Sequence, residues 1–206
     1  GQIHCGMPAL EGAIERVRLE QEMELEVIGG GCPVGLCGSG LIDLLGELLR
    51  TGRINSCGRL TDDSERFWVD ANNNIYLTEE DISQLAQAKA ANVAGLHLLH
   101  QNYGIDFSDL DRFYLAGGFA RHIDLDHARR IGLIPDLPDE RIVQVGNAAL
   151  EGATLALLSV AAREEIGKLV RGIEHVELEM FPEFFHCFTD GAQFESFHCR
   201  ITEAII

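Results

Sequence analysis

The strongest chemical signal is a pair of glycines at the end of an apolar segment, in FYLAGGFARHID (residues 113–124). The apolar segment predicts a buried strand, and DLDHARRIG after it predicts a helix. Gly117 and Gly118 carry no Cβ, so the backbone there can approach a flat ligand or a phosphate closely. The carboxyl end of a strand is also where α/β sheets bind ligands. Taken alone, the spacing fits a ligand site and a plain strand-to-helix turn equally well.

A second segment, VGNAALEGA, joins the expected strand RIVQVG to the expected helix NAALEGATLALLSVAAREE. Asn147 lies where the strand meets the helix. Its side chain can cap the helix, or it can hydrogen-bond a ligand at the same edge of the sheet. Capping is the simpler role for a lone asparagine.

A third segment, GLCGSGLID, is rich in glycine and leads into the expected helix LIDLLGELLRTG, which Gly52 ends. Gly38 and Ser39 belong either to a tight crossover loop or to an anion site, because a loop that enters a helix exposes backbone amides. Asp43 lies one turn into the helix. It either interacts with the helix dipole or lines a ligand site.

Lys89 is a lone base in the small, apolar stretch AQAKAAN. This stretch belongs to a long helix that we expect to begin after a Thr78 cap, with Asp81 near the capping-box position, and to end near Asn102. The lysine either extends along its apolar stem into solvent or contacts the ribose or phosphate of a nucleotide.

The cysteines do not predict a metal site or a disulfide framework. There are six, and no CxxC pair occurs. His186–Cys187 and His198–Cys199 are adjacent pairs, which do not match the usual ligand loops of zinc or iron–sulfur sites. We therefore expect no metal ligands and reduced thiols in a cytoplasmic protein.

Composition and missing motifs exclude several functions. The 33 acidic and 16 basic residues give a formal charge of −17, which opposes unaided binding to nucleic acid or to an anionic membrane. The longest apolar run, residues 148–162, is too short to cross a bilayer. We find no Walker A motif, no nucleophile elbow and no paired carboxylates at one site, so the catalytic residues stay unknown.

The remaining patterns indicate an α/β chain. Residues 1–30 alternate in polarity and predict strands, FWVD and IYLT predict a hairpin, and HVELEM predicts a last strand. A short helix, EEIGKLVRG, follows or continues the one before it. Helices and strands alternate through the second half of the chain, which is typical of α/β folds.

Four ordered segments together resemble a known family: GLCGSGLIDLLGELLRTGRI, LTEEDISQLAQAKAANVAGLHLL, FYLAGGFARHIDLDHARRIGLIPDLP and VGNAALEGATLALL. They are similar to the C-terminal domain of reductive activators of corrinoid-dependent enzymes, in the superfamily of acetate and sugar kinases, heat-shock chaperones and actin. IHCGMPALEGAIERV also resembles the stretch before the glycine-rich loop in those activators. The resemblance covers nearly the whole chain and implies a ribonuclease H-like, actin-like ATPase lobe with inserted helices and a mixed sheet.

The resemblance also implies a function. Family members join a [2Fe–2S] ferredoxin-like domain, a linker and an ATP-binding actin-like domain. They use ATP, with Mg²⁺, to drive the reduction of a Co(II) corrinoid to Co(I), and the cluster supplies the electron. The expected partner is the corrinoid protein of a methyltransferase system. Whether the protein forms a homodimer is left open.

Carried over residue by residue, the family pattern implies a nucleotide site. Gly117 and Gly118 match the adenosine motif, and Phe119, Ala120 and Arg121 flank the adenine or its phosphates. Lys89 falls on the helix that contacts ribose in related ATPases, and Asn147 follows the strand beside the adenosine motif. Gly38 and Ser39 lie in a loop near the region between the lobes.

The chain also departs from the family pattern. The DIGT-type phosphate motifs and the cluster-binding cysteines are absent, and Ala120 stands where a glycine is usual. We therefore expect residues 1–206 to be the C-terminal part of an actin-like ATPase domain, with the phosphate motifs and the iron–sulfur domain upstream. Such a piece should bind nucleotide weakly by itself and should not hydrolyse ATP.

Three alternatives remain. One is a kinase or a dehydratase activator on the same fold, whose adenosine motif would look alike. Another is a docking or scaffold lobe without nucleotide function, for which the −17 charge suits a basic partner. The last is a metal protein built on the Cys and His pairs.

Overall fold

The amino-terminal strands form a mixed sheet. The structure, a computed structural model, describes residues 3–197. In it β1 (Ala13–Leu19) lies between β2 (Met23–Val27) and β3 (Gly35–Leu36). β1 runs antiparallel to β2 and parallel to β3. The alternating pattern of residues 1–30 thus forms two strands as predicted, and the third strand lies inside the glycine-rich loop.

Helix α1 (Gly38–Arg50) covers this sheet and is the most extensively buried helix within residues 3–197. Every residue from 39 to 48 is buried, which is more than the single apolar stripe of an ordinary surface helix. The helix packs against β1 on one side and α3 on another. The close approach to β1 depends on Gly40, because a Cβ there would overlap the carbonyl oxygen of Ile14.

A hairpin leads into the long central helix, as the sequence predicts. β4 (Arg66–Asp70) and β5 (Ile75–Thr78) are antiparallel, and α2 (Glu79–Tyr103) follows directly. Thr78 and Asp81 form the expected capping box: each side chain accepts a hydrogen bond from the other residue's backbone N–H, at 3.2 and 3.0 Å. The helix ends at Gly104, whose φ is +65°.

The glycine pair follows a short parallel ladder. β6 (Phe113–Ala116) pairs with β7 (Ile142–Val145), and α3 (Leu125–Arg130) lies in the connection between them. Two short 3₁₀ turns, η1 (Phe107–Asp109) and η2 (Asp139–Arg141), precede the two strands. Both strands and α3 were predicted from the sequence.

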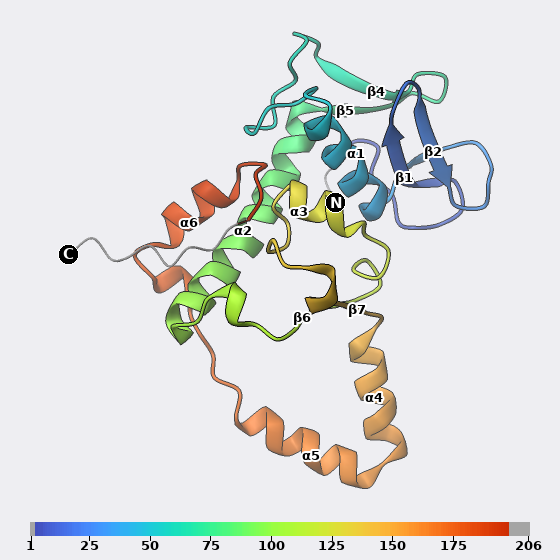
Figure 1. The fold of residues 1–206 in the computed structure, drawn as a ribbon. Helices are drawn as coiled ribbons and strands as arrows, with labels where there is room; N and C mark the ends of the chain where they lie inside the picture. Colours follow the sequence, from blue (N-terminus) through green and yellow to red (C-terminus); the bar gives the residue numbers. More distant parts are fainter. Residues whose placement is uncertain (1–2, 198–206) are drawn as a thin grey trace.

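Two helices project from this ladder as an arm (Figure 1). α4 (Ala148–Leu158) and α5 (Val160–Arg171) contain no buried residue. The expected continuous helix from Asn147 to Glu165 is wrong, because the chain breaks at Ser159. That residue is extended, and its side chain accepts a hydrogen bond from Ala162 N at 3.2 Å, which starts a new helix. No helix within residues 3–197 is long and apolar enough to span a bilayer.

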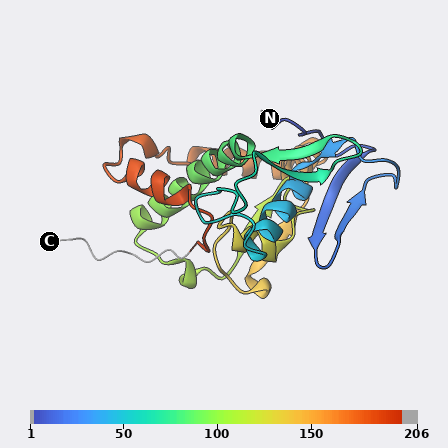
Figure 2. The ribbon, with the colours of Figure 1, turned by 90° about the horizontal axis from the view of Figure 1, so that it is seen from above.

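The segment after the arm returns to the central helix. The expected strand HVELEM (175–180) is wrong: within residues 3–197, β6 and β7 pair only with each other. This segment instead forms the 3₁₀ turn η3 (Leu178–Met180), which packs against α2 and α6. α6 (Phe184–Gly191) runs beside α2. Figure 2 shows α6 at the opposite end of the molecule from the β1–β2 hairpin.

We predict that Gly40→Ala destabilises the protein by about 1–3 kcal/mol, because the added methyl group forces α1 away from β1. Gly31→Ala is the control, since a Cβ at Gly31 meets no atom within 4 Å. Its effect should stay within about 0.5 kcal/mol. Denaturant unfolding followed by circular dichroism measures both, and equal stability of the two variants would refute the close packing of α1 on β1.

Candidate functional site

A pocket of about 470 Å³ lies between the amino end of α1 and the glycine pair after β6. One wall carries Gly38 and Ser39, and the other carries Gly118 and Phe119. Glu15 and His122 add polar groups, and the rest of the lining is mostly apolar. Two segments that lie about eighty residues apart in the sequence therefore meet at one site.

The amino end of α1 lacks a side-chain cap and adjoins the pocket. Its N-cap residue, Cys37, makes no side-chain hydrogen bond to the helix amides, and the first turn holds no acidic residue. The Cys37 thiol instead lies 3.3 Å from the carbonyl of Ile14 and 3.2 Å from the Ser39 hydroxyl. The first-turn amides thus lack a side-chain cap, which makes this helix end suitable for an anion.

The opposite wall is shaped by the glycine pair. Gly117 has a φ of +115°, which glycine adopts without strain, and its N–H donates to the carbonyl of Gly146 at 2.8 Å. This bond extends the β6–β7 ladder and turns Gly118 and Phe119 into the pocket. A Cβ on Gly38 would lie 2.7 Å from the Phe119 ring, so the ring rests on that glycine. Nearly half of the Phe119 surface, 48%, stays exposed.

Two other predicted site residues lie near this wall. Asn147 caps α4, because its side-chain oxygen accepts a hydrogen bond from Leu150 N at 3.0 Å. The guanidinium of Arg121 lies beside Gly146, 3.9 Å from where a Cβ would stand. Ala120 is buried, and its carbonyl accepts a hydrogen bond from Gln144.

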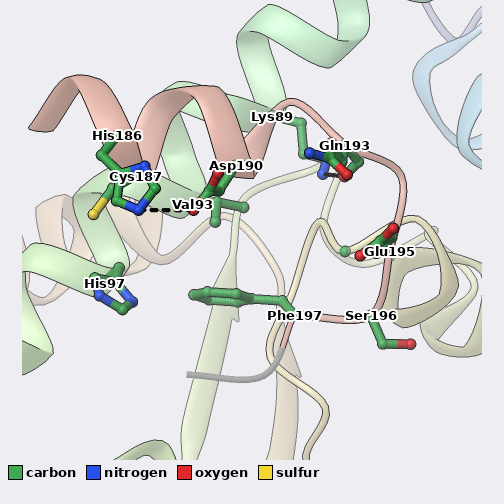
Figure 3. Close-up of a pocket in the computed structure, with 12 residues that line it drawn as sticks. Lys89, Val93, His97, His186, Cys187, Asp190, Gln193, Glu195, Ser196 and Phe197 are labelled. Carbon is green, nitrogen blue, oxygen red and sulfur yellow. Dashed lines mark hydrogen bonds and ion pairs between the residues drawn. The ribbon is translucent and has the colours of Figure 1, made fainter. Parts of the chain in front are cut away.

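Lys89 is placed elsewhere. It is 2% exposed, so the expectation that it extends into solvent is wrong. Its ammonium donates to the carbonyl of Gln193 and lines a second pocket of about 310 Å³ together with His186 and Phe197 (Figure 3). Burial lowers the pKa of Lys89 to about 8, and the negative charge of Glu195 opposes this change. A contact with nucleotide stays a prediction for this lysine, which here fastens the chain after α6 to α2.

The adjacent His and Cys pairs, which only the metal-protein alternative uses as ligands, are described in part. His186 and Cys187 line the second pocket, where His186 lies 3.5 Å from Asp190 (Figure 3). No group of three or more His, Cys, Asp or Glu side chains within residues 3–197 could hold a metal ion. His198 and Cys199 lie outside the described residues.

A buried charged cluster, which the sequence analysis missed, joins α1 to α3. The His127 ring lies between two carboxylates, with Nδ1 3.1 Å from Asp43 Oδ1 and Nε2 3.1 Å from Glu47 Oε1. Asp43 and Glu47 are 3% and 5% exposed. We name Asp43, Glu47, Arg50 and His127 the histidine bridge. Asp43 thus binds a histidine, and the expectation that no carboxylates pair at one site is wrong.

The charged groups of the histidine bridge change one another's pKa. The hydrogen bond from Arg50 lowers the pKa of Glu47 to about 2; burial opposes this, and bonds from Leu19 N and His127 support it. Burial lowers the pKa of His127, but the hydrogen bond to Asp43 and the charges of Asp124 and Asp43 outweigh it, so the net pKa is raised. The sequence signal was the i, i+4 spacing of Asp43 and Glu47 among leucines, which places both on one face of the helix.

Comparison with solved structures identifies the class of fold. The chain is similar to the solved structure of a reductive activator for corrinoid, iron–sulfur protein, with a TM-score of 0.85 and 34% identity over 95% of this chain. The fold is therefore that of an actin-like ATPase domain. The family model described as the C-terminal domain of RACo, the ASKHA domain, matches residues 1–203, and the chain belongs to this family. Membership in this fold class implies ATP binding.

Two curated relatives agree with this assignment. The chain is 35% identical over 217 residues to the corrinoid activation enzyme RamQ of Eubacterium limosum, covering 92% of this chain and 36% of that protein. It is 27% identical over 173 residues to the [Co(II) methylated amine-specific corrinoid protein] reductase of Methanosarcina barkeri. This match covers 80% of this chain and 31% of that protein. The solved structure is covered over 34% of its length. This chain thus spans about a third of the length of each of these three proteins.

The burial of Lys89 predicts a pH-dependent stability. Its folded pKa of about 8 lies below the usual 10.5, so between these values the unfolded chain holds a proton that the folded chain has lost. Raising the pH through this window therefore stabilises the folded state. We predict that Lys89→Met removes this gain, measured as urea unfolding at pH 8 and pH 10 relative to the wild type.

Lys168→Met is the matched control, because Lys168 lies on the exposed arm. It should keep the wild-type dependence on pH. A Lys89→Met variant with the same pH slope as the wild type would show that Lys89 is not held in an unfavourable environment for its charge.

Proposed function

We propose that the pocket between α1 and the glycine pair binds the adenosine of ATP and leads its phosphates to the amino end of α1. The observation that carries the proposal is the meeting of Gly38, Ser39, Gly118 and Phe119 around one cavity. These residues come from two separate segments of the family pattern. The family itself supports ATP as the ligand.

The lining suits the parts of a nucleotide. The half-exposed Phe119 ring can stack on a flat base. The carboxylate of Glu15 can accept hydrogen bonds from ribose hydroxyls, and the uncapped amides of α1 can bind a phosphate oxygen. Arg121 follows the glycine pair and supplies local positive charge against the overall −17.

We also propose that Mg²⁺ accompanies ATP on its phosphates. Phosphate oxygens, waters and one or two carboxylates usually hold this ion, so it needs no large group of protein ligands. A [2Fe–2S] cluster does need such a group, and none of three or more potential ligands occurs within residues 3–197; we assign the cluster to an upstream domain. In this proposal residues 1–206 are the C-terminal part of an actin-like ATPase domain in a longer protein.

The proposed activity of the longer protein is reductive activation of a corrinoid. The relatives are named as a corrinoid activation enzyme and as a Co(II) corrinoid protein reductase. An iron–sulfur cluster in the upstream domain would supply the one electron that reduces Co(II) to Co(I). ATP binding would shift the arrangement of the two lobes so that this transfer is favoured. The partner is a corrinoid protein of a methyltransferase system. The described cysteines are free, which suits a cytoplasmic location.

A docking role is the second candidate, and the arm is the feature that favours it. Leu155, Leu157 and Leu158 on α4, together with Leu169 and Val170 on α5, are all more than half exposed. Apolar surface of this extent marks an interaction site. Docking and nucleotide binding involve different parts of the molecule, so both can hold for one protein.

We predict that Gly118→Asp weakens ADP binding by about tenfold or more, equivalent to about 1.4 kcal/mol. The new carboxylate would repel the phosphates inside the pocket, and a Cβ at this position meets no atom within 4 Å, so the fold should survive. Isothermal titration calorimetry on the full-length protein measures the effect. Gly118→Asn is the matched control, because it has the same shape without the charge and should bind ADP more tightly than the Asp variant.

The same two variants test the coupling to cobalt. The full-length wild type should reduce its corrinoid protein from Co(II) to Co(I) in an ATP-dependent reaction, followed anaerobically by absorbance. Gly118→Asp should lose most of the ATP stimulation. Equal ADP binding by Gly118→Asp and Gly118→Asn would show that the nucleotide does not bind in this pocket. A rate of cobalt reduction that does not depend on ATP would contradict the activator function.

A further inference from the structure

One wall of the nucleotide pocket is the amino end of α1, and the other is the turn that precedes α3; the histidine bridge joins these two helices. Gly38 and Ser39 form the amino end of α1, and Gly118 and Phe119 begin the turn that leads to α3. His127 on α3 lies against Gly46 of α1, where a Cβ would come within 2.7 Å of the ring. The relative position of α1 and α3 therefore sets the width of the pocket.

Hydrogen bonds to β7 hold the turn between Phe119 and α3. His122 N donates to the carbonyl of Phe119 at 3.0 Å. The Gln144 side chain, on β7, donates to the carbonyls of Ala120 and Ile123 at 2.8 and 3.0 Å. Ala120 and Ile123 are both buried. Phe119, its turn, the β6–β7 ladder and the start of α3 thus form one wall, and the histidine bridge connects this wall to α1.

We infer that His127 is a positioning residue that holds the two walls of the nucleotide pocket at their binding distance, and that loss of a proton from its ring weakens nucleotide binding. This inference rests on the proposed function, because it concerns the same pocket. His127 itself does not line the pocket.

The hydrogen-bond geometry supports this role. A neutral imidazole donates from only one of its two ring nitrogens, whereas the protonated ring donates from both. The carboxylates of Asp43 and Glu47 face one nitrogen each, so only the protonated ring satisfies both. Glu47 cannot easily turn away, since it also accepts bonds from Leu19 N at 2.7 Å and from Arg50. The neutral ring leaves one buried carboxylate facing a nitrogen lone pair, which is costly.

The charged groups around His127 favour its protonated form. Asp43 and Glu47 face it from α1, and Asp124 Oδ1 lies 3.8 Å away at the start of its own helix. The other charged groups of the adjoining surface hollow are Arg18 and Glu20 from the β1 end, Arg50 from α1, and Asp126 and Arg130 from α3. Arg50 is paired with Glu47. The carboxylates outweigh burial and raise the pKa of His127 above 6.5.

The direction of the pH effect follows from this raised pKa. The folded protein keeps a proton that the unfolded chain releases near pH 6.5, so the stabilising contribution is complete below that pH. It is lost as the pH rises through the folded pKa. Nucleotide affinity should fall over the same window, because the walls are then held by one hydrogen bond in place of two.

The test measures ADP affinity by calorimetry from pH 6.5 to pH 9 on the full-length protein, in the wild type and in His127→Gln. Gln keeps one amide donor but does not titrate. We expect the affinity of the wild type to fall by about fivefold more than that of the variant. Comparing the two cancels the ionisation of ADP. His175→Gln is the control, because His175 is exposed and lies outside the nucleotide pocket, and it should keep the wild-type pH dependence.

A second readout separates positioning from stability alone. Linkage is reciprocal, so ADP should raise the pKa of His127, which NMR titration of the ring detects. Asp43→Asn should lower the pKa of His127, so the fall in ADP affinity should occur at lower pH. This variant takes the place of His127→Gln in the test if His127→Gln does not fold. Equal pH profiles in the wild type and His127→Gln, or a His127 pKa that ADP leaves unchanged, would overturn the inference while nucleotide binding stands. Failure of the wild type to bind ADP at any pH would overturn the proposed function itself.

Discussion

Helix α1 lies so close to β1 that only a glycine fits at position 40, against the carbonyl of Ile14. This contact fixes the amino end of α1 at the edge of the first sheet, where Cys37 bonds inward and leaves the helix amides uncapped. The same helix carries Asp43 and Glu47, which reach α3 through His127. The pocket, the histidine bridge and the orientation of α3 all depend on this one packing contact.

The acidic charge of the chain makes the local arrangement of the pocket important. A protein with a formal charge of −17 repels ATP at long range. Binding must then come from short-range groups: the helix amides, the aromatic face of Phe119 and Arg121 after the glycine pair. These groups bind ATP together only if the two walls of the pocket lie at the correct distance. Groups that already lie in place avoid the free-energy cost of rearrangement on binding. The turn held by Gln144 provides that order on one wall, and the burial of α1 provides it on the other.

Local sequence patterns predicted most elements and part of the site. The capping box at Thr78 and Asp81, the β4–β5 hairpin and the β6 strand before Gly117 each follow from signals within a few residues. The errors arose where neighbours decide the outcome. HVELEM has the alternation of a strand but pairs with no strand within residues 3–197. Ser159 breaks an otherwise helical run by capping a new helix.

In the site, too, local motifs reveal individual residues but not the contacts between residues that lie far apart in the sequence. The glycines and Phe119 are visible as a motif, but their meeting with Gly38 and Ser39 is a property of the fold. The sequence around Lys89 indicates a base that is exposed to solvent or binds a ligand. No residue near it in the sequence reveals that Lys89 is buried and donates to the carbonyl of Gln193. The partner of Asp43 and Glu47, His127, lies some eighty residues away along the chain, so the spacing of the two carboxylates could suggest a shared face but not the histidine between them.

Photolabelling of the full-length protein with 8-azido-ATP, followed by mass spectrometry of its peptides, shows whether ATP binds between α1 and the glycine pair. We expect labels on the segments 35–41 or 113–122, which line this pocket, and their loss when excess ATP is added. Labels on residues 186–197, which line the pocket of Lys89, would contradict the account. Labels that excess ATP does not displace would contradict it as well.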